Sequence, residues 1–225
     1  MDISDLNEHL LRLYLRLNGF FASGFIVHSP ESKRNKTEVD TIAVRFPHNL
    51  EPERQAKPDP WLDLSTGYVE LAICEAKSKV RFNEALYSDQ GTIQTILRWA
   101  GMFTESEVID LAPKVQTILT PEPNPSPKIR RIGPYRGTVI RSLLFCPKFE
   151  QPRTNQSWFV GSGPALSFIF SCLSPAFEPP SCGRCYGASQ WAELAPLVKF
   201  FKNWRANTPP TYKDFQKGMI NSGGP

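Results

Sequence analysis

The chain has 225 residues, a formal net charge of +4, 40% hydrophobic residues and 12% aromatic residues, which favours a globular protein of one domain, or of one domain with an extension. No apolar run approaches the length of a membrane span, so we expect no membrane partner. The first residues are acidic where a signal peptide needs positive charge, and the five cysteines are an odd number, so we expect a cytoplasmic protein.

A helix is the first predicted element. Ser4 or Asp5 can cap its N-terminus, and Asn18 followed by Gly19 is a typical C-terminal signal. Leucines recur at helical spacing between these ends. Glu8 is followed by arginines four and eight residues later, a spacing that predicts a solvent-facing ladder of charges.

Three predicted strands follow this helix. The segment from Phe20 to Val27 is aromatic and β-branched, the second strand covers Thr37 to Val44, and the apolar run from Tyr68 to Cys74 is too short for a typical helix. Prolines and charged residues between the second and third strands predict a long loop.

Charged residues mark the second and third of these strands. Side chains alternate along a strand, so Glu38 and Asp40 share one face of the second, and Glu75 and Lys77 share one face at the end of the third. If the two strands pair, the carboxylates and the amine converge. Such a cluster would destabilise the fold if it had no cation, because buried carboxylates repel each other and lose their hydration. Mg²⁺ would remove this cost, since it binds to one or two carboxylates and keeps several waters.

Asp40 and the triplet Glu75, Ala76 and Lys77 resemble the motif of the PD-(D/E)XK nuclease superfamily, which includes restriction endonucleases and Holliday-junction resolvases, with Val39 where the family has proline. The resemblance implies an α/β fold with a restriction endonuclease-like core, α-β-β-β-α-β, around a central mixed sheet flanked by helices. It also implies a Mg²⁺ or Mn²⁺ cofactor held by Asp40, Glu75 and the Ala76 carbonyl, with Lys77 serving the attacking water.

Two further candidate residues enter through the resemblance. Many members carry an acidic residue on the first helix, which makes Glu8 a candidate metal or water ligand, against the charge ladder described above. The segment from Glu84 to Phe103 has helical character. Some members place a glutamine of this helix at the active site, which makes Gln94 a candidate, and an amide on a helix surface is the alternative.

The remaining segments complete the predicted order. We expect a fourth strand at Val115 to Leu119, a loop from Thr120 to Pro134, a fifth strand at Thr138 to Cys146, and helices at Gly163 to Leu173 and Ser189 to Arg205. The nuclease-like core then spans residues 1–146. Residues 147–225 form a C-terminal helical extension packed on that core.

Basic residues flank the candidate site. Lys33, Arg34 and Lys36 precede the strand of Asp40, and Lys79 follows Lys77. These four residues are predicted to contact phosphates of a nucleic acid, with solvated loops as the alternative. A further basic cluster comprises Lys128, Arg130, Arg131, Arg136 and Arg141.

The cysteines divide into two groups. Cys74, Cys146 and Cys172 lie in apolar runs and are predicted to be small core residues. Cys182 and Cys185 have a spacing found in zinc sites, but a second tight pair is missing from the sequence. Zinc would need four such ligands, so the pair alone does not make a zinc site and its role stays open.

The expected function is hydrolysis of phosphodiester bonds in DNA, with RNA as the alternative substrate. The alternative function is a nucleic-acid-binding or interaction module with a vestigial site, and the presence of both acids and the lysine argues against it. Cutting two strands needs two sites related by symmetry, so a homodimer is an open alternative to a monomer.

Overall fold

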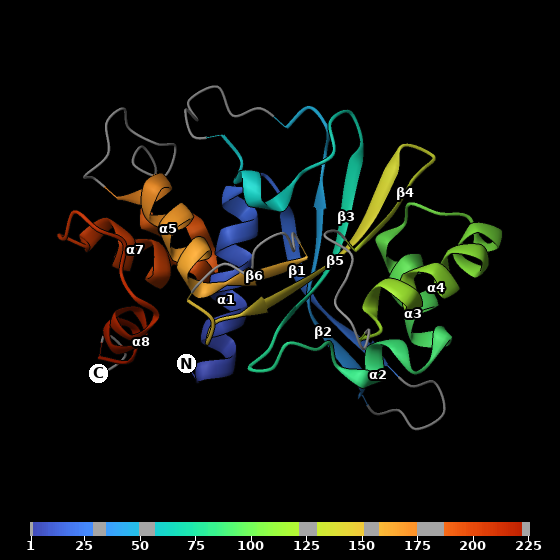
Figure 1. Cartoon of the computed structure of the whole chain (residues 1–225), viewed down its shortest axis with the longest axis horizontal. Coiled ribbons are helices and arrows are strands. Elements are labelled where there is room, and N and C mark those ends of the chain that lie inside the picture. The colour runs from blue at the N-terminus through green and yellow to red at the C-terminus, as the bar shows by residue number, and fades with distance from the viewer. Residues whose placement is uncertain are drawn as a thin grey trace.

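A mixed sheet of six strands lies between two layers of helices in the computed structural model (Figure 1), which describes residues 2–28, 35–49, 57–121, 130–150, 158–174 and 187–221. The strands are β1 (Phe21–His28), β2 (Asn35–Arg45), β3 (Val69–Ala76), β4 (Arg131–Tyr135), β5 (Thr138–Cys146) and β6 (Phe159–Gly161). The α-helices are α1 (Ile3–Leu17), α2 (Glu84–Tyr87), α3 (Gln90–Ala100), α4 (Glu105–Leu119), α5 (Ser162–Leu173), α7 (Ala195–Asn203) and α8 (Tyr212–Asn221), and two 3₁₀ helices are η1 (Pro60–Leu62) and η2 (Ala188–Leu194). The expected α/β class with a central mixed sheet is thereby confirmed.

The strand order places the two candidate acidic strands side by side. The order is β1-β2-β3-β5-β4, and β6 pairs with β5 outside this path. β2 is antiparallel to both β1 and β3, whereas β3 and β5 are parallel. A parallel pair needs a long crossover, and the chain through α2, α3 and α4 provides it. β2 and β3 therefore pair, as the sequence interpretation required.

The first helix begins and ends close to its predicted bounds. Its N-cap is Asp2, two residues before the earliest predicted cap, and the Asp2 carboxylate accepts a hydrogen bond from the Asp5 amide at 2.9 Å. At the other end Gly19 has φ of +84° and its amide donates to the Arg16 carbonyl at 3.0 Å. A left-handed residue at this position is the reason that glycine ends the helix.

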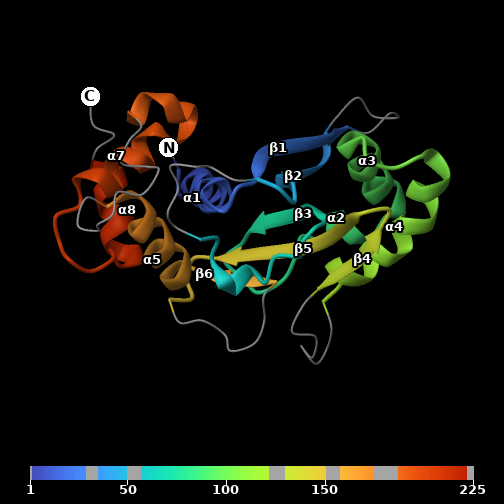
Figure 2. The ribbon, with the colours of Figure 1, turned by 90° about the horizontal axis from the view of Figure 1, so that it is seen from above.

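Helices cover both faces of the sheet, as Figures 1 and 2 show from two directions. On one face lie α1 and α5, with α7 and α8 beyond them, and on the other lie α2, α3 and α4. Along β3, Ala72 and Cys74 belong to the core on the α1 side, whereas Leu71 and Ile73 belong to the core on the α3 side. Burial on both faces explains why this strand is continuously apolar in the sequence.

The predicted fourth strand at Val115 to Leu119 is wrong, because these residues form the last turns of α4. Val115 and Leu119 are fully buried in the core between α3, α4 and the sheet. A run of five mostly apolar residues fits a strand or a buried helix turn equally well, and packing decides between them. The helix starts where the Thr104 amide donates to the Glu107 carboxylate at 2.7 Å. β4 lies partly in the predicted loop, and β6 was not predicted.

Two predicted helices are interrupted. In the first, the Asp89 carboxylate accepts from the amides of Gly91 and Thr92, both at 3.1 Å, and so starts α3 as a separate helix after α2. In the second, Ala192 has φ of 49° and ψ of −125°, which separates the 3₁₀ turns of η2 from α7. The predicted helix at Gly163 to Leu173 is confirmed as α5.

Chain beyond residue 146 joins both the sheet and the core. β6 adds a strand beside β5, and α5, α7 and η2 bury apolar side chains against α1. Cys74, Cys146 and Cys172 are buried, as expected for core residues. Among the described residues, none of the helices has the length and hydrophobicity that crossing a membrane requires.

Candidate functional site

A β-bulge in β2 shapes the candidate site. Ser23 of β1 pairs with Ile42, and Phe25 pairs with Val39, so Asp40 and Thr41 together oppose the single residue Gly24. A bulge of this kind bends the strand and re-aims the side chains at the extra residue. Asp40 thus lies at the bulge, where its side chain need not point in the direction that regular strand pairing would give it.

Arg12 of α1 braces this bulge. Its Nη2 donates to the Asp40 carbonyl at 3.0 Å, and its Nε donates to the Thr41 hydroxyl at 3.3 Å. A Cβ at Gly24 would lie 2.7 Å from the same Nη2. Glycine at position 24 therefore leaves room for the guanidinium, and α1 is tied to the backbone of Asp40.

The side chains of Asp40, Glu75 and Lys77 meet where the pairing of β2 with β3 stops, in the middle of β2 and at the C-terminal end of β3. Lys77 Nζ lies 3.0 Å from Asp40 Oδ2 and 3.3 Å from Glu75 Oε1. The Ala76 amide donates to Asp40 Oδ2 at 2.8 Å. Pairing of Thr41 with Cys74 in the antiparallel register places Asp40 beside the C-terminal end of β3. The convergence expected from the sequence is present, with one ammonium shared by two carboxylates.

Glu75 is the most deeply buried member of this cluster. Its side chain is 0% exposed, and Oε2 accepts a hydrogen bond from the Asn83 amide at 2.5 Å. Its other oxygen, Oε1, meets Lys77 without hydrogen-bond geometry. Burial raises the pKa of Glu75 to about 7, against the lowering effects of Lys77 and the Asn83 amide, and the charge of Asp40 adds to the rise.

The pKa of Lys77 is set by the same burial and by the two neighbouring carboxylates. Burial alone lowers its pKa, but the charges of Glu75 and Asp40 outweigh burial and leave the pKa above its ordinary value. Lys77 therefore stays protonated at neutral pH. As an ammonium it can donate hydrogen bonds and stabilise negative charge.

Glu8 of α1 lies close enough to Asp40 for their charges to interact. Burial and the nearby charge of Asp40 raise the pKa of Glu8 to about 7, while Arg12 opposes the rise. The Glu8 carboxylate lies 3.3 Å from Arg12 Nη2, and both side chains are largely covered. The predicted ladder of exposed charges is thus only partly right, because Arg12 turns toward the sheet and Arg16 lies 4.5 Å from the ring centre of Trp191.

No family model matches the chain, and neither the curated proteins nor the solved structures contain a significant match.

Other candidate residues make no described hydrogen bond or ion pair with this cluster or lie outside the described chain. Gln94 accepts a hydrogen bond from Arg98 at 3.4 Å on α3, and among the described residues no hydrogen bond joins it to Asp40 or Glu75. Glu38 is exposed. Lys33, Arg34, Cys182, Cys185 and the side chain of Lys36 lie outside the described residues.

Two arginines of the more distant basic cluster are buried inside the fold. Arg141 is buried and donates to both oxygens of Glu70, at 2.7 and 3.0 Å. Arg130 is buried with its guanidinium 4.3 Å from the ring centre of Trp158. These two arginines hold elements together, because a paired or stacked guanidinium inside the fold has no access to a nucleic acid.

The donor chemistry of the cluster suits a hard divalent cation. Within the described residues, no three side chains of His, Cys, Asp or Glu form a ready metal-binding group, so the protein would offer Asp40 and Glu75 with Ala76 at the backbone between them. Mg²⁺ accepts such a small protein share because it keeps several waters. When both acids are ionised, the two carboxylates and the single ammonium carry a net negative charge that a cation could neutralise.

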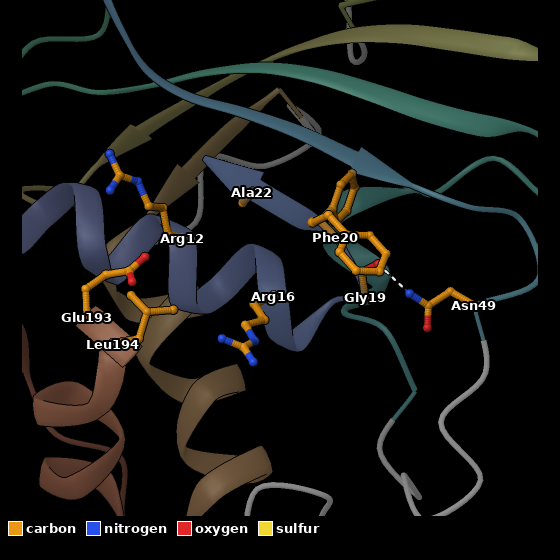
Figure 3. A pocket seen from close by; sticks show the side chains of 9 residues that line it. Arg12, Arg16, Gly19, Phe20, Ala22, Asn49, Glu193 and Leu194 are labelled. Atoms are coloured by element: carbon orange, nitrogen blue, oxygen red, sulfur yellow. Dashed lines mark hydrogen bonds between the residues drawn. The ribbon is translucent and has the colours of Figure 1, made fainter. Parts of the chain in front are cut away.

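A cavity of about 350 Å³ borders Arg12 (Figure 3). It is lined by Arg12 and Arg16, by the chain from Gly19 to Ala22, and by Asn49, Glu193 and Leu194. The Asn49 amide donates to the Gly19 carbonyl at 2.6 Å. This cavity lies between α1 and the start of β1, and its lining includes two arginines and one glutamate.

The raised pKa of Glu75 predicts a pH dependence of stability. Its pKa is about 7 in the folded protein and near 4.5 when exposed, so the folded state binds the proton more tightly between these values. The free energy of unfolding should therefore fall as pH rises from about 4.5 to 7, by on the order of 2–3 kcal/mol from this residue. We expect Glu75→Gln to remove this part of the fall.

Urea unfolding in EDTA at several pH values measures the effect. The matched control is Glu150→Gln, which changes an exposed glutamate and should keep the wild-type pH profile. A Glu75→Gln protein whose stability follows the wild-type profile across the window would show that Glu75 titrates normally.

Proposed function

We propose that the protein is a metal-dependent nuclease that hydrolyses phosphodiester bonds in DNA through Asp40, Glu75 and Lys77. One observation carries the proposal: the Lys77 ammonium lies within 3.3 Å of two carboxylates on adjacent strands. An ion cluster that served packing alone would not need a second, buried carboxylate whose pKa is raised to about 7. The arrangement fits a site completed by a cation and a substrate phosphate.

The fold supports the resemblance to the PD-(D/E)XK superfamily. A helix, three antiparallel strands, a helical crossover and a parallel fourth strand follow one another as α1, β1, β2, β3, α2 to α4 and β5, with β4 inserted before β5. The acids lie on the second and third of these strands, as the motif requires. The bulge at Asp40 adds a feature that often accompanies active sites.

The residues divide the work as follows. Asp40 and Glu75 would hold Mg²⁺ or Mn²⁺, which when bound would acidify a water and stabilise charge on the phosphate. Lys77, protonated at neutral pH, would orient the attacking water and donate to the phosphate oxygens as negative charge develops. Glu8, with a pKa of about 7 next to Asp40, is suited to accept the proton that the water loses. Arg12 holds the Asp40 backbone in place.

Incubating supercoiled plasmid and single-stranded DNA with the protein tests the proposal. We expect cleavage in Mg²⁺ or Mn²⁺ and none in EDTA, because two carboxylates with one lysine lack the charge to stabilise the transition state. RNA in parallel reactions defines the substrate class. Cleavage that persists in EDTA would contradict the proposal. Nucleic-acid binding without cleavage in any metal would favour the alternative, a binding module with a vestigial site.

A further inference from the structure

A second cavity, of about 390 Å³, opens directly beside Lys77. Its walls come from the segment that joins β3 to α2 and from Tyr87 of α2. Three cationic side chains line it, Lys77, Lys79 and Arg81, together with one carboxylate, Glu84. The cavity therefore holds an excess of positive charge next to the carboxylates of the candidate site.

Two of these cations have no counter-charge. Lys77 is shared between Asp40 and Glu75, whereas Lys79 and Arg81 make no ion pair with any residue that the structure describes. The cavity of Figure 3 differs in this respect. There Arg12 is engaged by Glu8 and the Asp40 carbonyl, and the Glu193 carboxylate lines the same space.

The basic segment is anchored at both ends. The Lys77 amide donates to the Phe145 carbonyl of β5 at 2.8 Å, and the Asn83 amide donates to Glu75 at 2.5 Å. Between these points the Arg81 amide donates to the Lys79 carbonyl at 2.8 Å in a tight turn. Lys77 and Glu75 take part in these two hydrogen bonds and also belong to the candidate site. The segment that carries Lys79 and Arg81 is therefore tied to the site at both of its ends.

We propose that this cavity binds a phosphate group of the nucleic-acid strand, adjacent to the phosphodiester bond that Asp40, Glu75 and Lys77 act on. The inference rests on the proposed function and extends it to the neighbouring nucleotide. Lys79 offers a point charge and Arg81 a planar set of donors, the two forms of phosphate recognition that proteins use. The phosphate is an internal diester of the strand or a monoester at its end, and both present the same anionic oxygens.

Binding measured without cleavage tests this inference. Fluorescence anisotropy with a labelled single-stranded oligonucleotide in EDTA compares the wild type with the double variant Lys79→Gln/Arg81→Gln. We expect affinity to fall roughly 10- to 100-fold, since each residue loses a charge-assisted hydrogen bond. The slope of log Kd against log salt should become shallower by about 0.7, because the contact with one phosphate of a single strand is lost.

A double variant of equal charge serves as the control. Lys114→Gln/Lys213→Gln changes two exposed lysines outside the cavity and should bind almost as the wild type does. An equal loss in both double variants, an unchanged affinity in the Lys79 and Arg81 variant, or no binding by the wild type would overturn the inference.

Oligonucleotides with a 5′-phosphate, a 3′-phosphate or hydroxyls at both ends identify the source of the phosphate. A loss confined to one phosphorylated end supports a terminal monoester, and an equal loss for all three supports an internal diester. Because the measurement needs no turnover, its outcome is separate from that of the cleavage assay. A protein that cuts DNA but ignores Lys79 and Arg81 would refute this inference alone, and one that binds through them without cutting would refute only the proposed function.

Discussion

Replacing Lys77 by alanine should lower the rate of metal-dependent cleavage by roughly 10²- to 10⁴-fold, the range typical of a positioned proton donor or a charge-stabilising group. Lys77 is the ammonium that both Asp40 and Glu75 contact, and its protonation at neutral pH follows from those two charges. Without it, no described ammonium lies between the carboxylates, and the water and the developing charge lose their donor.

The loss should appear in kcat more than in substrate binding. Lys79 and Arg81 remain in the Lys77→Ala protein, so DNA affinity should change much less than the rate. Plasmid cleavage under single-turnover conditions, with anisotropy in EDTA on the same samples, separates the two quantities. Lys114→Ala, on the exposed face of α4, is the control for loss of one lysine. Wild-type rates from Lys77→Ala would remove this residue from the chemistry.

Removing the ammonium also has a structural consequence. Glu75 is fully covered, and it keeps only the Asn83 amide as a described hydrogen-bond partner when Lys77 is absent. A buried carboxylate without a cation becomes harder to ionise, so the pKa of Glu75 should rise further in Lys77→Ala. Circular dichroism at pH 6 confirms that the variant is folded before its rate is interpreted.

The central strands β2, β3 and β5 could be predicted from the sequence, because each has the residue pattern of a strand. β5 was predicted with the bounds Thr138–Cys146 that the structure has, since a continuous apolar run is typical of a strand buried on both faces. The approach of Asp40 to Lys77 followed from strand alternation once β2 and β3 were paired. Both inferences use only local periodicity and one pairing.

Contacts made by tertiary packing could not be predicted in this way. Arg12 reads as a member of an exposed ladder, and only the position of α1 beneath β2 turns it toward the Asp40 carbonyl. The bulge left one signal, Gly24 inside a strand pattern, which often marks irregular pairing or a close approach. The link from Asn83 to Glu75 left none, because a backbone amide carries no residue type.

The missed helix shows a different limit. Val115 to Leu119 has the short, β-branched character of a strand, and α4 contains Pro113, which discourages a helical reading. A signal was present upstream, because Thr104 followed by Glu107 matches a capping box. Burial of Val115 in the core between α3, α4 and the sheet then outweighs local preference.

Replacing Asp40 by asparagine should uncouple stability from metal. In the wild type, two carboxylates share one ammonium, and the pKa of Glu75 is raised to about 7 by burial and, to a lesser extent, by the charge of Asp40. An asparagine oxygen can still accept the hydrogen bond that the Ala76 amide gives to Asp40. Lys77 then pairs with Glu75 alone. We expect metal-free Asp40→Asn to be as stable as the wild type or more so.

Metal should stabilise only the wild type. A ligand that binds the folded state at 100 times its Kd adds about 2.7 kcal/mol, which for a chain of this size raises Tm by roughly 5–10 °C. Asp40→Asn lacks one of the two carboxylates, so its Tm should rise much less with Mg²⁺ or Mn²⁺, and its cleavage should be lost. The control Asp110→Asn changes an exposed carboxylate of α4 and should respond as the wild type does.

Calorimetry decides between a working metal site and a self-neutralised ion cluster. Titration of Mg²⁺ and Mn²⁺ into the wild type should give binding heat, and metal affinity should increase as pH rises through about 7, because Glu75 must lose the proton that its raised pKa retains before it can bind the metal. Asp40→Asn should give little heat under the same conditions. If wild type and Asp40→Asn show the same metal-insensitive melting curves and no binding heat, the cluster of Asp40, Glu75 and Lys77 is a structural ion cluster, and the binding-module alternative becomes the better account of the protein.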